Sequence, residues 1–367
     1  VFRHSIPGIL QTFSSLTPDS GAPNKKLRWE KTHSVNAGFD FAVLNQAINL
    51  SVDYYYRKGV DLIGTQMLPL ETGFEMLTVN WASMQNQGVE VALSTRNIHT
   101  KNFMWTTNFN FAYNNNKILK EALREDALEP GREGYPVGAL FALKTAGLDE
   151  EGYPMFEGKD GKAVSAMEFF KLQEWGFGAT DLTARERREL YTYVGTADCP
   201  YTGGFNNTFT YKAFELGVNF SFDFGGKVRS QPTYSIVDFD KGRNTNRDIL
   251  NRWTPENTET IFPVLLSQNE RLDEYMWYSN QNEIYRNLDI WIRDLNYVRL
   301  QNIRLGYTLP TNFSRKLGMT SATIAIEGRN LLVFGSSYKN YLDPETMSNA
   351  YATPAPKSVT LSLNLNF

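Results

Sequence analysis

The stretch KSVTLSLNLNF, residues 357–367, alternates between polar and apolar side chains from Ser358 to its last residue. The apolar side chains occupy every second position: Val359, Leu361, Leu363, Leu365 and Phe367. Successive side chains of a β-strand point to opposite faces of a sheet. The stretch therefore predicts a strand with one apolar face and one polar face.

The same alternation recurs elsewhere in the chain. The clearest copies are residues 35–41, 48–56, 89–93, 105–113 and 214–224. Asparagine, serine, aspartate and glycine fill many of the positions between the apolar residues. Repeated segments of this kind predict an all-β fold built from an antiparallel sheet.

Three features of these segments favour a membrane protein. Their length matches the ~9–11 residues with which a tilted strand crosses a bilayer. Their polar faces carry small side chains suited to a water-filled interior. Their apolar faces often begin and end in aromatics, as in Trp105 with Tyr113 and Phe214 with Phe224, which is typical of the two aromatic girdles of a barrel. We predict a transmembrane antiparallel β-barrel, with a soluble β-sandwich as the alternative.

The barrel hypothesis assigns an outward direction to the apolar side chains. The residues that we expect to face lipid are Phe109, Phe111, Leu216, Val218, Phe220, Leu361 and Leu363.

The composition excludes other classes of protein. The 37 Lys and Arg residues are outnumbered by 40 Asp and Glu residues, so no basic surface for nucleic acid is expected. No run approaches the ~18 apolar residues of a membrane-spanning helix. The single cysteine, Cys199, excludes an internal disulfide framework. No signal peptide precedes Val1, so we expect a processed chain or one that begins partway through a longer protein.

The lengths of the connections assign a direction to each strand, because barrels of this kind have short periplasmic turns and long extracellular loops. Short connections are expected at 42–47, 97–102, 212–213 and 311–320, and long ones at 59–84, 115–137, 158–204, 225–294 and 333–356. Strands are then expected at 28–41, 47–58, 85–97, 103–114, 138–146, 153–157, 205–212, 214–224, 295–308, 320–332 and 357–367. Residues 153–157 are included because two successive descending strands need a rising strand between them. The alternation slips within 295–308, which predicts a β-bulge near Gln301 and Asn302.

These assignments give about 11 strands. Bacterial single-chain barrels have even counts, and an open sheet would leave unpaired backbone groups in hydrocarbon. We therefore expect another polypeptide, or further residues of the same protein, to complete the sheet. Plugged outer-membrane transporters have about 22 strands, so the chain is predicted to be about half of such a barrel.

Five segments of the chain resemble one known family. They are LRWEKTHSVNAGFDFAVLNQAINLSVDYYYRKGVDLI (27–63), MQNQGVEVAL (84–93), PYTGGFNNTFTYKAFEL (200–216), LNYVRLQNIRLGYTLP (295–310) and EGRNLLVFGSSYKNYLDPE (327–345). Together with the last strand, they are similar to the C-terminal half of the barrel in SusC/RagA-family TonB-linked outer-membrane proteins. The resemblance follows the order of the family and runs from about residue 27 to the end of the chain.

The resemblance implies a function and partners. Proteins of this family import oligosaccharides or peptides across the outer membrane of Bacteroidota, together with a SusD-like surface lipoprotein. It implies that residues 1–26 are an extracellular loop segment, and that 27–367 are half-barrel, without the plug, the N-terminal half-barrel or the segment that contacts the TonB complex. It also implies a multi-pass protein in the bilayer, and Phe367 resembles an outer-membrane assembly signal.

Aromatic residues in the long loops are the candidate contacts for a substrate or for the lipoprotein lid. They are Trp175, Trp253, Tyr275, Trp277 and Tyr278. Aromatic rings stack on sugars and anchor protein interfaces, but they also pack loops against one another, and both readings stay open. Residues 183–193 are expected to form a short helix that stiffens the extracellular rim.

The sequence offers no catalytic set, metal site or cofactor site. Its three histidines, His4, His33 and His99, are scattered, so neither a metal spacing nor a Ser-His-Asp triad is expected. The acidic run 149–151 lies beside turn residues and is expected to be solvated. Import is therefore the favoured function. A porin or a metal-chelate importer of another TonB-dependent class is the alternative, and a glycan-active enzyme is the last choice.

Overall fold

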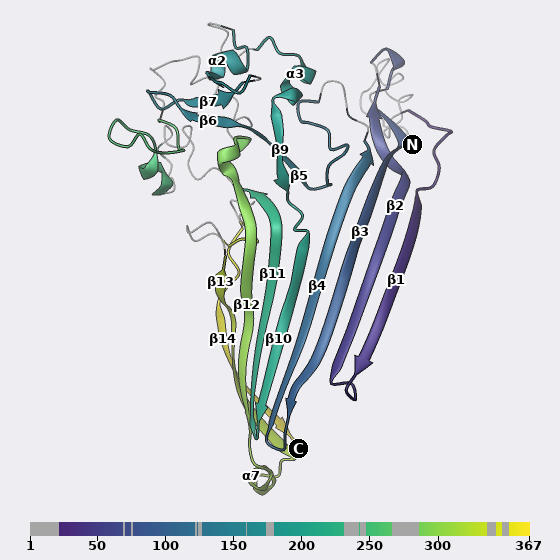
Figure 1. The fold of residues 1–367 in the computed structure, drawn as a ribbon, viewed down its shortest axis with the longest axis vertical. Coiled ribbons are helices and arrows are strands. Elements are labelled where there is room, and N and C mark those ends of the chain that lie inside the picture. The colour runs from purple at the N-terminus through teal and green to yellow at the C-terminus, as the bar shows by residue number, and fades with distance from the viewer. Residues whose placement is uncertain are drawn as a thin grey trace, which may run out of the picture.

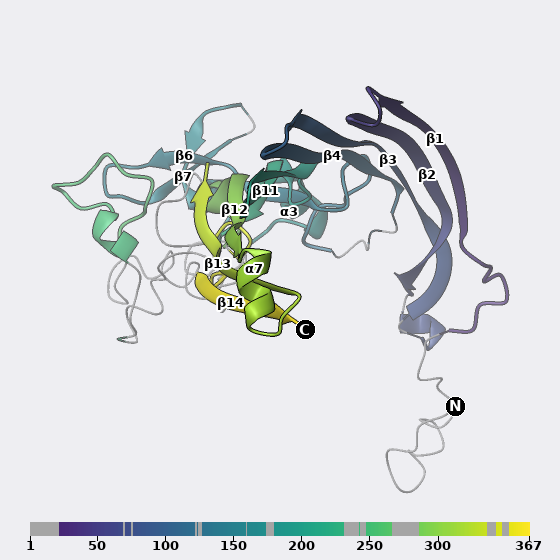
Figure 2. The same cartoon turned by 90° about the horizontal axis from the view of Figure 1, so that it is seen from below.

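The computed structural model describes residues 22–68, 70–74, 76–121, 123, 127–158, 160–173, 180–230, 242, 247–265, 286–335, 343–346 and 352–367. Its main feature is one sheet of nine antiparallel strands, in the order β1-β2-β3-β4-β10-β11-β12-β13-β14. The strands are β1 (Lys31–Val43), β2 (Ile48–Met67), β3 (Met76–His99), β4 (Phe103–Lys120), β10 (Tyr201–Tyr211), β11 (Phe214–Arg229), β12 (Ile292–Thr308), β13 (Ser321–Phe334) and β14 (Ser358–Asn366). They run side by side along the molecule (Figure 1), and from below they follow an arc (Figure 2).

The register of the strands keeps one face of the sheet mainly apolar. One cross-strand row runs through Phe41, Leu50, Leu93, Phe109, Phe205 and Phe220. The neighbouring row runs through Asp40, Ser51, Ala92, Asn110, Gly204 and Ser221. A slip of one residue would exchange the faces of a strand. The alternation in the sequence therefore predicted the two faces correctly.

The apolar face is exposed to its surroundings along the sheet. Phe39 of β1 is 60% exposed and Leu361 of β14 is 76% exposed. On a soluble monomer the largest apolar patch covers about 300–600 Å², whereas this face extends over all nine strands. The predicted all-β antiparallel fold is confirmed, and the apolar face has no protein layer over it in the described part of the chain.

The predicted count of about 11 wall strands is wrong, because two short segments belong to other sheets. β5 (Ala139–Leu143) pairs with β9 (Tyr191–Thr196), and β7 (Pro154–Glu157) pairs with β6 (Thr145–Leu148) and β8 (Ala163–Val164). Four or five residues at about 3.3 Å each cannot cross a hydrocarbon layer of about 30 Å. With both segments removed, β4 and β10 are antiparallel neighbours and no extra strand is needed.

The predicted long loop at 59–84 is also mostly strand. β2 continues to Met67 and β3 begins at Met76, and the two strands stay paired over this extension apart from irregularities between Gly59 and Ile63. The alternation of β2 is broken there, because its pairing with β3 is irregular between Gly59 and Ile63. Hydrogen bonding of the backbone continues where the sequence pattern stops.

The predicted bulge in β12 is confirmed. Gln301 has no partner in either ladder: Asn219 pairs with Asn302 and Phe220 pairs with Leu300, and the register against β13 is also interrupted at Gln301. The extra residue returns Ile303 and Leu305 to the apolar face. The change of parity in the sequence is therefore compensated in the sheet.

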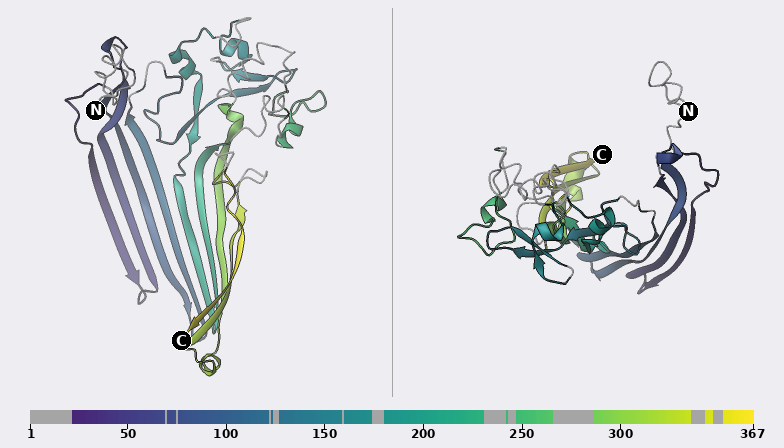
Figure 3. Two further views of the ribbon diagram at one scale, coloured as in Figure 1. Left: turned by 180° about the vertical axis from the view of Figure 1, so that it is seen from behind. Right: turned by 90° about the horizontal axis from the view of Figure 1, so that it is seen from above.

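Short turns gather at the lower end of the sheet in Figure 1, where Phe367 also lies. They are residues 44–47, 100–102 and 212–213, and the β12–β13 connection that carries helix α7 (Thr311–Lys316). At the opposite, upper end lie the small sheets with helices α2 (Ala166–Phe169) and α3 (Ala184–Glu189), as Figure 3 shows from two further sides. The helix expected at 183–193 is thus α3 followed directly by strand β9.

The upper part has its own hydrophobic core, built from segments far apart in the sequence. Phe156, Leu288 and Trp291 are completely buried, and Leu143 and Phe170 pack with them. Three 3-10 helices complete the described elements: Leu70–Thr72, Arg247–Asn251 and Asp289–Trp291. Among the described residues no helix is long and apolar enough to cross a bilayer.

Candidate functional site

The polar face of the sheet is the candidate functional site, and amide side chains dominate its centre. Asn108, Asn206, Asn219 and Asn302 occupy one cross-strand row on β4, β10, β11 and β12. Adjacent strands lie about 4.8 Å apart, so the four carboxamides form a closely spaced row. Each carboxamide has two donors and one acceptor oxygen, which suits water or an uncharged polar solute.

A cavity of about 550 Å³ lies over this part of the face. Its lining comes from six neighbouring strands, from Asp40 on β1 to Asn219 on β11. Most of the lining residues belong to the polar face, although members of the apolar row from Phe41 to Phe205 also contribute. Six strands enclose one cavity only on the concave side of a curved sheet, so the polar face is the concave face. Within the described part of the chain, the amides of Asn108, Asn110 and Asn219 make no hydrogen bond to protein groups. They are available to whatever occupies the cavity.

An aromatic residue crosses the polar face beside this cavity. Tyr55 on β2 lies over Gly88 on β3, and its hydroxyl donates a 3.0 Å hydrogen bond to Oδ1 of Asn114 on β4. A Cβ atom at Gly88 would come within 2.6 Å of the Tyr55 oxygen. The glycine therefore leaves the space that this tyrosine needs.

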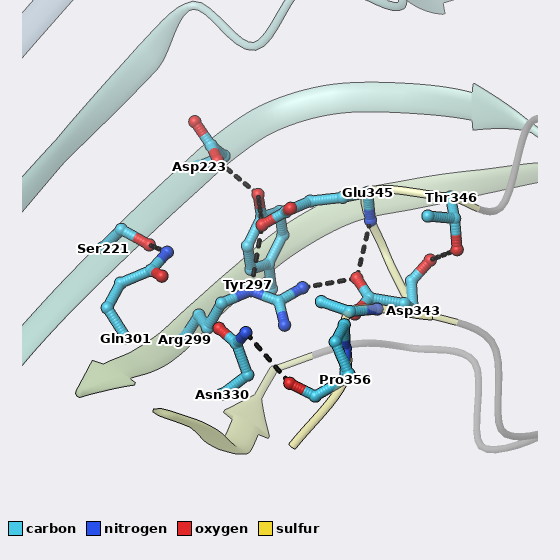
Figure 4. Close-up of polar contacts among 11 residues, drawn as sticks. Ser221, Asp223, Tyr297, Arg299, Gln301, Asn330, Asp343, Glu345, Thr346 and Pro356 are labelled. Carbon is cyan, nitrogen blue, oxygen red and sulfur yellow. Dashed lines mark hydrogen bonds and ion pairs between the residues drawn. The ribbon is translucent and has the colours of Figure 1, made fainter. Parts of the chain in front are cut away.

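A network of charged groups occupies the polar face of β11 and β12 (Figure 4). The guanidinium of Arg299 donates to Oδ1 of Asp343 through Nη2 and to Oε1 of Glu345 through Nε, the latter at 2.9 Å. The Tyr297 hydroxyl lies 2.5 Å from Oδ2 of Asp223 and 3.1 Å from Oε1 of Glu345. The Arg299 side chain is only 2% exposed and the Asp343 side chain 7%. This network places the connection between β13 and β14 against the wall.

The Asp343 carboxylate also organises the connection itself. Its Oδ1 accepts from the backbone N–H of Glu345 at 3.1 Å, and its Oδ2 accepts from that of Ala355 at 3.4 Å. Burial alone would raise the pKa of this carboxyl, but the hydrogen bonds from Arg299 and from Glu345 N–H hold the pKa below its usual range. Asn330 Nδ2 donates to the Pro356 carbonyl at 3.2 Å.

Sequence reasoning missed this network. It assigned 333–356 to an extracellular loop, whereas β13 continues to Phe334. Further along that segment, Asp343 and Glu345 bind Arg299 of β12, and Pro356 accepts from Asn330 of β13. A signal was present: Arg299 is a charged residue at a polar-face position of β12, and Asp343 and Glu345 flank a proline. Nothing in the spacing of these residues links Arg299 to Asp343, which lies 44 positions later in the chain.

Only one of the aromatic candidates lies within the described residues. Trp253 is half-buried, its ring lies against Gly152, and its backbone N–H donates to the Phe262 carbonyl at 3.0 Å. It thus packs two parts of the upper region together, and contact with a substrate or lid stays a prediction. Four candidates lie outside the described residues: Trp175, Tyr275, Trp277 and Tyr278.

The structure places the residues expected to face lipid on the apolar face. Phe109, Phe111, Leu216, Val218 and Phe220 share it in the ladders of β4, β10 and β11, and Leu361 and Leu363 pair with apolar residues of β13. Phe367 is 84% exposed at the lower end. Lipid contact, and an assembly role for Phe367, stay predictions. In the described ranges no three His, Cys, Asp or Glu side chains are grouped as a metal site.

Known TonB-dependent receptors are similar to this chain over most of its length. No protein-family model matches the chain. A TonB-dependent receptor, P3, of Formosa agariphila is 28% identical over 94% of this chain and 35% of its own length. The TonB-dependent receptor SusC of Bacteroides thetaiotaomicron is 26% identical over 94% of this chain and 32% of its own length. The chain resembles a TonB-dependent receptor of the SusC type.

The chain therefore spans about a third of the length of these SusC-type relatives. A structure of the RagAB peptide transporter has the same fold. It matches 94% of this chain and 36% of its own chain, with a TM-score of 0.69 at 23% identity. The RagAB peptide importer in its open-open state matches with a TM-score of 0.70. At this identity the likeness concerns the fold alone.

Proposed function

We propose that this chain forms part of the wall of an outer-membrane importer. Its apolar face contacts lipid, and its concave polar face borders the path of the solute. The continuous two-faced sheet carries this proposal, because an apolar face exposed over nine strands suits hydrocarbon and no aqueous surface. The SusC-type relatives support it, since they are TonB-dependent receptors.

The proposed substrate is an oligosaccharide or a peptide, taken up with a SusD-like surface lipoprotein and powered through the TonB complex. Both solutes carry neutral hydrogen-bond donors and acceptors, and the amides of the Asn108 row match that chemistry. The upper region, with its own buried core around Trp291, offers a preformed surface to a lipoprotein. RagAB is a peptide transporter by name, and its fold is shared.

The sheet also needs completion in this proposal. In the described sheet β1 pairs only with β2, and β14 pairs only with β13. Unpaired strand edges cost several kcal/mol per backbone group in hydrocarbon. Strands from the rest of a longer polypeptide, together with its plug, fill this role, and the relatives are about three times as long as the part matched.

Purification of the intact transporter tests the proposal. An affinity tag is inserted in the exposed turn at Asp160–Lys162, away from the wall, and the protein is extracted from outer membranes in mild detergent. Mass spectrometry is expected to find a surface lipoprotein in the complex. Uptake of fluorescent oligosaccharides and peptides by the same cells then identifies the solute class, with a TonB-deficient strain as the control.

The outcomes separate the candidate functions. Loss of uptake in the TonB-deficient strain and recovery of the lipoprotein agree with the proposal. Uptake that persists without TonB, with no lipoprotein attached, favours a passive porin. Recovery of the tagged protein from the soluble fraction would refute the membrane-wall hypothesis and favour a soluble β-sandwich.

A further inference from the structure

Two of the sequence segments that carry the family resemblance meet in space. One is 295–310, which forms most of β12, and the other is 327–345, which forms the upper part of β13 and ends at Glu345. The described turn Asp343–Thr346 returns from β13 to the polar face of β12 and closes on itself through Thr346 N–H and the Asp343 carbonyl at 2.9 Å. We call residues 343–346 the inner turn.

The inner turn is attached to the wall by charge. Figure 4 shows Asp343 and Glu345 pointing toward Arg299 and Tyr297 of β12. The Arg299–Asp343 pair is almost completely buried, so solvent screens it far less than a surface pair. The carboxylates of Asp343 and Glu345 converge here on one guanidinium, and the carboxylate of Asp223 lies beside them through the Tyr297 hydroxyl. Without that cation they would repel one another.

The inner turn is also braced at a second place. Asp343 accepts from Ala355 N–H, and Asn330 of β13 donates to the Pro356 carbonyl just before β14 begins. The entry to β14 is therefore tied both to the inner turn and to the wall. Contacts at two separate points hold the described parts of this segment against the concave face.

We propose that the inner turn is a fixed constriction of the solute path and that Arg299 is the residue that holds it there. This inference rests on the proposed import function, and it makes Arg299, Asp343 and Glu345 the determinants of which solute sizes pass. The turn lies on the row of the sheet that continues from the cavity: Arg299 pairs with Ser221, which follows Asn110 and Gly204 in the same row. A solute that moves along the concave face meets it.

Labelling of a cysteine tests the attachment without any transport. In a Cys199→Ser background, Thr346→Cys is treated with a water-soluble maleimide in the intact transporter. Arg299→Met is expected to raise the labelling rate by about tenfold or more, the change that follows from losing a hydrogen bond to a charged group. Arg304→Met is the matched control, because it removes the same charge from β12 in the more exposed pair with Glu215.

Uptake of a size-graded series of one solute tests the constriction. Arg299→Met is expected to raise the uptake of long members relative to short ones, and Arg304→Met to leave the ratio unchanged. Gel mobility of unheated samples checks that both variants assemble. Equal labelling of Thr346→Cys in Arg299→Met and in its parent, or an unchanged size ratio, overturns the proposal.

A cross-link distinguishes a fixed constriction from a moving gate. Asn330→Cys and Pro356→Cys, joined by a short bismaleimide, lock the segment onto β13. The proposal predicts that uptake survives the cross-link, whereas loss of uptake identifies a gate and refutes a fixed turn. If the parent imports no solute at all, the proposed function fails, and the labelling experiment still decides whether Arg299 holds the inner turn.

Discussion

The effect of a new charge in a wall strand depends on which face of the sheet the residue occupies. Leu216 and Phe220 lie on the apolar face of β11, and Asn219 lies on the polar face between them. Asp at Leu216 or Phe220 places a carboxylate in hydrocarbon, which we expect to destabilise the folded protein by about 2–4 kcal/mol or somewhat less. Asn219→Asp is expected to be mild.

Denaturant titration of the protein in lipid vesicles measures this difference. The three variants share one new charge on one strand, so the comparison isolates the direction of the side chain. Equal loss of stability at Leu216 and Asn219 would mean that the assignment of the two faces is mistaken.

A second prediction for a single residue concerns Gly88. Gly88→Ala is expected to displace Tyr55 from Asn114, because the new methyl group meets both the tyrosine ring and the Tyr113 carbonyl oxygen of the next strand. Overpacking of this kind costs about 1–3 kcal/mol. Unfolding of vesicle-bound protein checks the cost, and Tyr55→Leu together with Gly88→Ala should recover part of it. If the double variant recovers no stability, the strain comes from the contact with the Tyr113 carbonyl oxygen alone.

At the scale of elements, the bulge in β12 gives the sharpest prediction. Deletion of Gln301 removes the residue that is skipped in both ladders, and Leu300, Asn302 and Ile303 then alternate without a break along β11. The faces of 302–308 do not change, so membrane assembly, measured as the fraction of outer-membrane protein that resists unfolding in unheated detergent gels, is expected to be retained. Deletion of Ile303 is the matched contrast: it turns Arg304 toward lipid and Leu305 inward, and assembly is expected to collapse.

Helix α3 is expected to depend on pH. Its capping box pairs Thr183 with Glu186: the backbone N–H of Thr183, then its hydroxyl and then Lys171 lower the pKa of Glu186 from 4.5 to about 2. A lowered pKa stabilises the folded form above the ordinary value and loses that contribution as the pH falls from about 4.5 toward 2. Hydrogen exchange of α3, corrected for intrinsic rates, should rise over this interval. Glu186→Gln keeps the capping geometry and should remove the pH dependence.

The sequence predicted the elements well where both faces of a strand differ in polarity. The strands around Phe109, Phe220 and Leu361, and the bulge at Gln301, follow from period-two alternation alone. The pattern fails where the pairing is irregular or where a strand is buried on both faces. The pairing of β2 with β3 is interrupted between Gly59 and Ile63, and β5 is buried on much of its surface, so the alternation did not identify these strands correctly.

The whole molecule consists of a wall and an upper region, and the path of the chain allows most of the upper region to be removed without cutting a wall strand. The segment between β4 and β10 leaves and returns at one place, since Ala197 N–H donates to the Gly138 carbonyl at 2.7 Å. Replacement of 139–196 by a short Gly-Ser linker is expected to leave the wall assembled, with β10 still paired to β4. The same replacement exposes Leu288 and Trp291 and should abolish binding of the proposed lipoprotein.

Gel mobility and co-purification measure the two effects separately. Retained assembly with loss of the partner agrees with a separable upper region. Failure of the wall to assemble would show that the core around Trp291 is needed for the long strands themselves.

The candidate site was predicted only in part at this scale. The concave polar face follows from the same alternation as the apolar face. The inner turn does not, because it depends on a contact between Arg299 and Asp343 that joins β12 to the connection after β13. Sequence patterns report the surroundings of one strand, whereas such a contact depends on the three-dimensional path of a connection.

The unequal lengths of the strands give the molecule a slanted rim. β3 has 24 residues and β14 has 9, so at about 3.3 Å per residue the wall stands far above the hydrocarbon on one side and ends near its surface on the other. The described parts of the segment after β13 add no height there, because they fold inward at Asp343 and Pro356. In the proposed importer, a solute that approaches beside β14 therefore crosses a lower edge of the wall than one that approaches over β2 and β3.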